Sequence, residues 1–322
     1  MSALLDTEDA DISKIFCIRD EKGRVALRIG LVATMFLAEP WTQPVREAVT
    51  EAAEEYIRQF REHLRWAKGP NSGHVRPLDK GKVRFPRDWL PQHKDGKTWD
   101  FGFSGGETEE SASEFLLSAM GSDDTSKDTG YFQVYLPLTW FAEHPGTFQD
   151  FVLNLAKRLR PLSGYAGIGV LEPLDVYDRQ PYMPTVRQIA ERFPGLEIES
   201  TYVHTIHLGE GIKGVNWLTI LGDRWIQQIG GLDYLRIRLG DDFKLTSYDG
   251  GLMIQAGPKP QIGDVTTNRW PRHYVTLAKV LKPIQIKEHY AFHLDDPDPM
   301  GAPRLDAVSN SSEAWLFRFD GK

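Results

Sequence analysis

Hydrophobic positions in the first part of the chain follow a strand pattern and then a helix pattern. The apolar run Val25–Leu37 predicts a buried strand. Apolar residues then recur at helical spacing over 45–64, which predicts a helix. Thr42 is placed to cap this helix and Pro44 falls in its first turn. The stretch 68–97, rich in glycine, proline and basic residues, is expected to be a long loop.

A strand–helix–strand pattern follows. Residues 131–138 and 165–171 are predicted strands, and an apolar stripe between them predicts a helix. Thr147 is expected to cap that helix, with Asp150 placed to return the hydrogen bond. The stretch 173–184, which contains proline and tyrosine, is a candidate junction between two halves of the chain.

The C-terminal part alternates short helices and strands. Thr185 and Gln188 form a capping-box pattern for a short helix that Pro194 would stop. The elements expected after it are strands near 196–208 and 215–221, helices near 223–229 and 232–239, a hairpin over 243–256, a helix over 274–281 and a strand over 313–319.

This alternation predicts an α+β fold, with antiparallel or mixed sheets packed with helices. The two halves look loosely alike, because a strand–helix–strand order near 138–170 recurs near 218–254. An internal duplication and chance similarity both remain open, since such units are common. The expected division is an N-terminal half at 1–175 with charged loops and a C-terminal half at 185–322. The halves could also form one compact unit.

Composition describes a soluble globular protein. The chain has 322 residues, of which 41% are hydrophobic and 26% charged. The net charge of −7 argues against a nucleic-acid-binding protein, which usually carries a basic excess. The single cysteine, Cys17, allows no intrachain disulfide and fits a reducing compartment. The acidic start lacks the cationic and apolar regions of a signal peptide, so a cytoplasmic location is expected.

Motifs for cofactors, metals and nucleophiles are weak. The glycines of 209–214 satisfy a dinucleotide-binding string, but a strand is expected after them where that motif needs a helix. His204 and His207 would face opposite sides of a strand. His289 and His293 have helical spacing, but no zinc-binding pattern completes them. No P-loop or serine nucleophile elbow is found, so no cofactor, metal or catalytic residue is expected.

The block 211–283 is dense in turn signals and poor in reactive chemistry. Gly-Gly pairs at 230–231 and 250–251 suit positive backbone dihedrals, and Pro-Lys-Pro at 258–260 marks a turn. Trp217 and Trp225 add large rigid surfaces. This combination favours a scaffold or a binding protein over an enzyme.

The same block carries a recognisable pattern. It consists of GVNWLT at 214–219, a GG-Leu helix at 230–239, a strand ending in AG-x-x-P-x-x-GD at 252–264, and a helix ending in L-K-P at 274–283. In these segments the chain resembles the cytoplasmic immunity proteins of bacterial type VI secretion systems. The N-terminal half agrees only in its order of elements. The residues that carry the resemblance, expected to be structural, are Gly214, Asn216, Trp217, Gly230, Gly231, Gly257, Pro260, Gly263, Asp264 and Pro283.

The resemblance implies a protein partner. It implies tight, stoichiometric binding of one cognate effector toxin by steric occlusion, with no reaction catalysed and no direct contact with nucleic acid or membrane. For a cytoplasmic protein the natural target is a toxin that acts in the cytoplasm, and a nuclease is the first expectation. An acidic strip could occupy the basic substrate groove of a nuclease in place of phosphates.

Two neighbouring charge blocks are the candidate partner surface. Residues 68–97 carry eight basic residues against three aspartates, and 98–130 carry eight acids against one lysine. Such blocks are usually solvated faces, but complementary charge also guides association between proteins. The candidate partner-binding acids are Asp100, Glu107, Glu109, Glu110, Glu114, Asp123, Asp124, Asp128, Asp295, Asp296 and Asp298.

Two other functions remain open. A hydrolase could use Asp264, His273 and Asp223, provided that the fold brings them within hydrogen-bond reach in one pocket. A single-stranded nucleic-acid binder could use the basic loop 68–97 with its aromatic residues, because bases stack on such rings. The aromatic candidates are Trp66, Phe85, Trp89 and Trp99.

Overall fold

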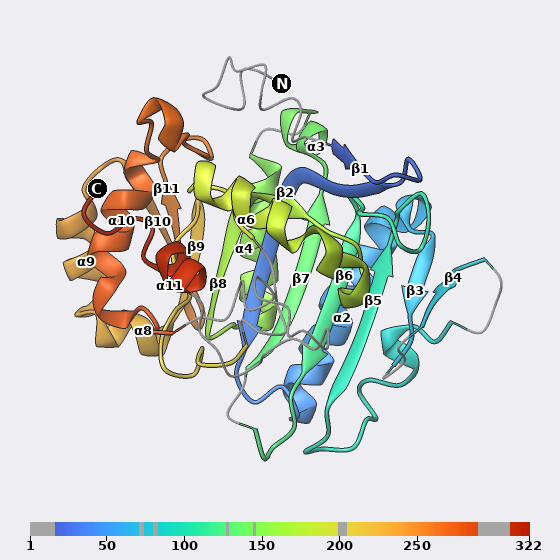
Figure 1. Cartoon of the computed structure of the whole chain (residues 1–322). Coiled ribbons are helices and arrows are strands. Elements are labelled where there is room, and N and C mark those ends of the chain that lie inside the picture. Colours follow the sequence, from blue (N-terminus) through green and yellow to red (C-terminus); the bar gives the residue numbers. More distant parts are fainter. Residues whose placement is uncertain are drawn as a thin grey trace.

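One antiparallel sheet organises the chain (Figure 1). The computed structural model describes residues 17–70, 74–79, 83–126, 129–143, 146–198, 205–288 and 310–322. Within these residues eleven strands form a single sheet in the order β10-β11-β9-β8-β2-β7-β6-β5-β3-β4, with β1 paired to β2. The predicted α+β class is therefore confirmed, with antiparallel rather than mixed pairing between all the named strands.

The strands lie throughout the chain. Their bounds are β1 Cys17–Arg19, β2 Val25–Leu37, β3 Trp66–Lys68, β4 Val75–Pro77, β5 Trp99–Ser104, β6 Leu116–Gly121, β7 Gly130–Leu136, β8 Ser163–Leu171, β9 Leu218–Gly222, β10 Phe243–Tyr248 and β11 Gly251–Ala256. The helices are α2 Gln43–Phe60, α3 Leu138–Glu143, α4 Thr147–Leu159, α5 Val176–Arg179, α6 Met183–Arg192, α8 Asp223–Gln228, α9 Gly231–Leu239, α10 Arg272–Leu281 and α11 Asn310–Leu316.

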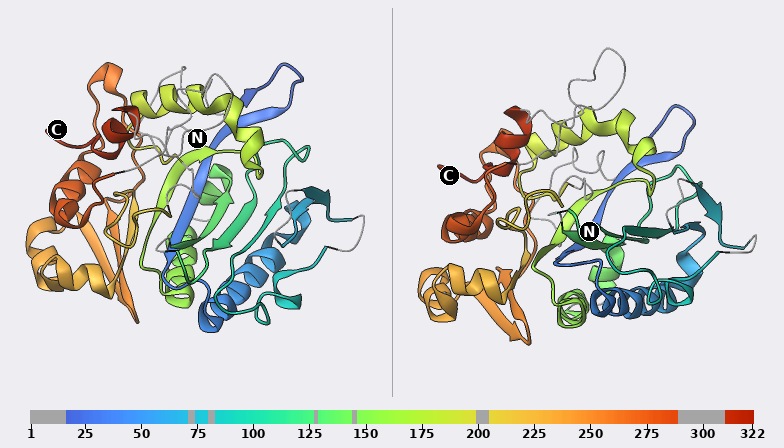
Figure 2. Two further views of the ribbon diagram at one scale, coloured as in Figure 1. Left: turned by 60° about the horizontal axis from the view of Figure 1, so that its bottom comes forward. Right: turned by 90° about the horizontal axis from the view of Figure 1, so that it is seen from below.

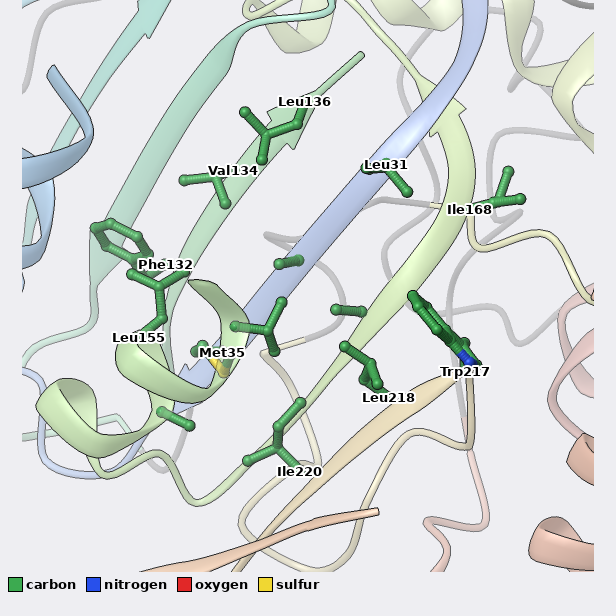
Figure 3. Packing of buried hydrophobic residues seen from close by; sticks show 14 of the residues in the cluster. Leu31, Met35, Phe132, Val134, Leu136, Leu155, Ile168, Trp217, Leu218 and Ile220 are labelled. Carbon is green, nitrogen blue, oxygen red and sulfur yellow. The ribbon is translucent and has the colours of Figure 1, made fainter. Parts of the chain in front are cut away.

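Strand β2 lies in the middle of the sheet and is buried on both faces. Leu31 and Met35 point to the face covered by α2 and α4, where they join the main hydrophobic core (Figure 3). Phe36, one residue further, packs on the opposite face with Leu208 and Leu316. Two buried faces explain why the strand appears in the sequence as a continuous apolar run.

Helices cover the two faces of the sheet in separate groups. Figure 2 shows α2 and α4 side by side on one face, and α6 running across the other. Helices α8, α9 and α10 gather at the end of the sheet formed by β9, β11 and β10. Because β8 pairs with β9, the sheet continues from the expected N-terminal half into the C-terminal half. The division into 1–175 and 185–322 stays a prediction.

Most predicted elements are present, with some boundaries shifted. Strand β2 has the predicted bounds, and the hairpin β10–β11 covers 243–256 as expected. Thr42 is the N-cap residue of α2, but its hydroxyl donates to the carbonyl of Glu39 instead of capping the helix. Helix α4 begins at Thr147, so Gly146 occupies the cap position. The loop 68–97 contains the short strand β4.

Three predictions in the C-terminal part were wrong. The expected terminal strand over 313–319 is instead the end of α11 and a turn, because Trp315, Leu316 and Phe319 are buried at helical spacing. Thr185 lies inside α6, which begins at Met183, so it is not a cap. The expected strand 196–208 forms one isolated bridge, from Glu197 to Gly169, and turns at 205–210, while 199–204 lies outside the described residues.

No helix in the described residues is long and apolar enough to cross a membrane.

Candidate functional site

A buried ion pair lies at the start of the motif block. Lys213 and Glu197 are each only 2% exposed, and the Lys213 Nζ lies 2.7 Å from Oε1 of Glu197. The ammonium also donates to the hydroxyl of Tyr165 at 2.8 Å and to the carbonyl of Ile198 at 3.1 Å. Burying two charges is unfavourable unless each is paired and hydrogen-bonded, and here both conditions are met. The pair joins the segment before β9 to the face of β8.

Asn216 extends this network onto the sheet. Its side-chain nitrogen donates to Oε2 of Glu197 at 3.1 Å, and its Oδ1 accepts the backbone N–H of Trp217. Gly167 of β8 lies directly beneath, because a Cβ there would come within 2.0 Å of the Asn216 Oδ1. The glycine is therefore required by the close approach of the two chains, and the approach lets Asn216 reach Glu197.

Aromatic rings and Arg318 complete the network. The Lys213 ammonium lies over the rings of Tyr165 and Trp315, at 4.5 Å and 4.9 Å from their centroids. Arg318 lies over Trp315 and donates to the carbonyl of Pro194 at 2.7 Å. Burial lowers the pKa of Arg318 to about 10, although the charge of Glu197 opposes the shift. The C-terminal segment is therefore fixed on the same polar cluster as the motif block.

Trp217 fixes the motif block to β11. Its indole nitrogen donates to the carbonyl of Gly257 at 3.1 Å, its backbone carbonyl accepts from Ala256, and its ring stacks on Phe148 of α4. Gly257 has a φ of 78°, and a Cβ there would come within 2.7 Å of the His273 ring. Trp217 thus connects the segment before β9 to β11 and to helix α4.

Asp264 organises the turn after β11. Its carboxylate accepts the backbone N–H of Thr266 at 2.9 Å and the Thr266 hydroxyl at 2.6 Å. It also pairs with Arg192 of α6 at 3.0 Å. Burial raises the pKa of Asp264, but the hydrogen bonds from Arg192 and Thr266 outweigh it and leave the pKa below its usual value. The carboxylate is therefore ionised and committed to structural bonds.

The other motif residues occupy turns and caps. Gly230 is the N-cap of α9 with a φ of 108°, and Gly231 and Gly263 also have positive φ. Gly214 leads from the ion-pair segment toward β9, Pro260 is buried in the loop after β11, and Pro283 lies in the turn that closes α10. The structural role expected of these residues stays a prediction.

The candidate acids are scattered, and several pair with the chain's own arginines. Three glutamates of the loop 105–115 pair with three arginines of the β1–β2 hairpin: Glu107 with Arg19, Glu110 with Arg24, and Glu114 with Arg28. Such partly exposed pairs contribute about 0–1 kcal/mol each, so they position the loop more than they stabilise the fold.

The remaining candidate acids have other environments. Asp100 lies 3.4 Å from Lys68. The hydrogen bonds from Thr125 hold the pKa of Asp123 below its usual value. Asp124 packs against Gly96, and Glu109 is exposed. Four acids lie outside the described residues: Asp128, Asp295, Asp296 and Asp298.

The hydrolase candidates have separate roles in the described structure. Asp264 is bonded to Thr266 and Arg192, His273 lies 3.3 Å from the side chain of Gln261, and Asp223 begins α8. A small pocket of about 10 Å³ beside the network is lined by apolar residues together with Gln285, Arg318 and Asp320. Among the described residues, no group of three His, Cys, Asp or Glu side chains is placed to hold a metal ion.

The aromatic residues of the nucleic-acid hypothesis belong largely to the core. Trp99 and Trp89 are 0% and 5% exposed, and Phe85 stacks on Phe103 of β5. Trp66 donates its indole N–H to the carbonyl of Gly106. The buried rings of Trp89 and Trp99 present no face on which a base could stack, whereas Trp66 and Phe85 are half-buried.

Sequence reasoning missed two features next to β8. Glu172 is fully buried beyond the end of the strand, with Arg179 at 3.7 Å, and burial raises its pKa to about 7 against the opposing charge of Arg179. Val176 and Tyr177 on α5 are 49% and 73% exposed. A buried glutamate and an exposed tyrosine give no sequence signal, since burial depends on segments far apart in the chain.

Comparisons with known proteins point to one kind of protein. The family model described as type VI immunity for VRR-NUC matches residues 48–319. A solved structure titled Pseudomonas aeruginosa T6SS protein PA0821 is similar, with a TM-score of 0.83 and 25% sequence identity. The similarity covers 97% of this chain and 90% of that one. No curated protein matches the chain.

The buried ion pair predicts a large effect of removing one charge. Lys213→Met leaves Glu197 buried without its cation and is expected to lower the free energy of unfolding by about 3–5 kcal/mol. Lys282→Met is the matched control, because Lys282 forms a pair of the same 2.7 Å length with Asp320, but with side chains 40% and 52% exposed. That control is expected to cost about 0–1 kcal/mol in urea unfolding. Equal losses in the two variants would contradict a structural role for the network.

Glu172 predicts a pH dependence of stability. The unfolded chain loses this proton near pH 4.5 and the folded chain near 7, so stability falls between these values as pH rises and is level above them. Glu172→Gln carries no proton to lose, so its free energy of unfolding lacks this fall. Between pH 4 and pH 8 the variant is therefore expected to gain up to about 3 kcal/mol of unfolding free energy relative to the parent. Urea unfolding at both pH values checks this, with the exposed Glu191→Gln as control. The interpretation is wrong if the parent and Glu172→Gln have the same pH slope.

Proposed function

Because this chain belongs to the family of type VI immunity proteins for VRR-NUC effectors, we propose that it binds one cognate effector and neutralises it. The observation that carries the proposal is the family match, which spans 48–319 and therefore most of the described fold. The T6SS protein with a similar fold over 97% of the chain supports the same assignment. Neutralisation of an effector is a binding function, and it requires no catalytic residue in this chain.

We propose that the effector is a nuclease and that it is held inactive by occlusion. The family description names a VRR-NUC partner, and a nuclease must present a cationic surface to the phosphates of its substrate. This chain carries a net charge of −7 and exposes carboxylates on its surface loops. Complementary charge speeds encounter and selects the partner. A bound acidic protein would exclude the nucleic acid by occupying the same surface.

The place of action follows from the partner. A nuclease effector damages the cell once it reaches nucleic acid in the cytoplasm, so the protein that neutralises it is expected there. Binding must also be tight, because a few free effector molecules suffice to cut a chromosome.

The stoichiometry of inhibition tests this proposal. The effector encoded beside this chain's gene is titrated with the chain, and cleavage of plasmid DNA is followed. Occlusion predicts that cleavage stops at one chain per effector, that the two co-elute in size-exclusion chromatography, and that co-expression rescues growth. The inactive effector is recovered in active form when the complex is dissociated.

Different outcomes separate the alternatives. Inactivation of the effector by far less than one equivalent of the chain would show that the chain is an enzyme. Absence of growth rescue together with absence of a complex would contradict the proposed function.

A further inference from the structure

The structure points to one face of the protein as the docking surface for the effector. We propose that the nuclease docks its phosphate-binding face on the surface formed by Val176 and Tyr177 of α5 and by the carboxylates around them. The inference rests on the proposed function and names the partner surface for it. This surface, here the Tyr177 surface, comprises Glu21, Glu109, Asp175, Val176, Tyr177 and Asp178.

The apolar centre of the Tyr177 surface is unusually exposed. Within the described residues, the exposed large hydrophobic side chains are Val176, Tyr177 and Ile237, and the first two are adjacent on one short helix. Tyrosine is enriched among the residues that dominate binding energy, because its ring buries a large area and its hydroxyl keeps a hydrogen-bonding group. Exposed next to an aliphatic neighbour, Tyr177 has the chemistry of an interface anchor.

Side-chain hydrogen bonds to the backbone fix helix α5 in place. Arg179, which is 8% exposed, donates to the carbonyls of Pro173 and Leu174 at 2.7 Å and 3.2 Å. Asp175 caps the helix by accepting the backbone N–H of Tyr177 at 2.9 Å. A side chain on a fixed backbone loses less conformational freedom on binding, so Tyr177 is preorganised for a partner.

Three segments distant in sequence bring acidic residues around α5. Figure 2 shows the β1–β2 hairpin next to α5 in both views. The loop 105–115 contacts the hairpin, because the N–H of Ala112 donates to the carbonyl of Val25 and Glu110 pairs with Arg24. Together 17–28, 105–115 and 175–179 carry eight carboxylates and five cations, a net charge of −3.

These carboxylates lie close enough for their charges to act on one another. Burial raises the pKa of Asp178, and the like charges of Asp175 and Glu109 raise it further. The opposing charges of Arg24 and Arg179 lower it. Glu21 takes part as well. Burial raises the pKa of Tyr182, the charges of Asp20, Asp178 and Glu21 also raise it, and Arg24 lowers it.

The excess negative charge is available to a partner. Glu107, Glu110 and Glu114 are paired with arginines, as described above. Within the described residues, Glu21, Glu109 and Asp178 have no cation within 4 Å. A cationic protein surface would therefore find carboxylates that are not already neutralised, at the rim of an apolar anchor. This is the arrangement of a hot spot within a polar rim.

The third exposed hydrophobic residue has different neighbours. Ile237 on α9 is 82% exposed and lies between Arg236 and Arg238 in sequence, and Arg236 pairs with Asp233 at 3.1 Å. Val176 and Tyr177 instead lie between Asp175 and Asp178. The flanking carboxylates favour the Tyr177 surface for a cationic partner, and Ile237 serves as a control of comparable exposure.

Affinity measurements on single variants test the inference. The full chain and its variants are titrated with the purified effector encoded beside this chain's gene, at low and at moderate salt. Tyr177→Ala is expected to raise Kd about 30-fold or more, as for an anchor at the centre of an interface. The double variant Glu109→Gln/Asp178→Asn is expected to slow association and to reduce its dependence on salt. Ile237→Ala and Asp241→Asn, an exposed residue after α9, are expected to bind as the parent does.

The outcomes distinguish the docking surface from the function. If the parent binds and Tyr177→Ala and the double variant bind equally well, the surface is wrong while the proposed function stands. If Ile237→Ala alone loses binding, the α9 face is the docking surface. If the parent is a dimer that Tyr177→Ala makes monomeric, with effector binding unchanged, the surface joins two copies of this chain. If the parent itself does not bind, both proposals fail. Equal urea midpoints of parent and variants ensure that a loss of binding is not a loss of folding.

Discussion

The buried pair of Lys213 and Glu197 is the interaction on which the C-terminal half of the structure depends. It anchors the segment before β9 to the face of β8, where Gly167 and Gly169 leave room for the approaching chain. The same cluster receives the C-terminal segment through Trp315 and Arg318. A buried charge tolerates few alternative partners, so this network selects one arrangement of segments that hydrophobic packing alone would leave less defined.

The residues that identify the family and the residues proposed to bind the partner lie in different parts of the molecule. Asn216, Trp217 and Asp264 make the contacts of a scaffold, with β8, with β11 and with α6. Tyr177 makes little contact with the rest of the chain and is available to a partner. Such a division suits an immunity protein, because one fold can then serve many effectors through changes on its surface alone.

Local patterns predicted the fold better than the site. The bounds of β2 follow from its apolar run, and the β10–β11 hairpin follows from its Asp249-Gly250 turn. The segment 313–319, expected as a strand, instead ends α11, because Trp315, Leu316 and Phe319 are buried at helical spacing. The acidic residues were noticed in sequence, but their pairing with Arg19, Arg24 and Arg28 depends on the loop 105–115 meeting a hairpin about 90 residues away, which no local pattern contains. The exposure of Tyr177 likewise depends on the whole fold.

Hydrogen–deuterium exchange on the chain, free and bound to its effector, tests most directly whether scaffold and docking surface are separate. The account predicts that binding slows exchange at 19–25, 107–110 and 175–179. Exchange at 213–219 should be slow in both states and change little, because those amides lie in the buried network. Protection confined to 213–219 or to α9, with 175–179 unchanged, would contradict the account.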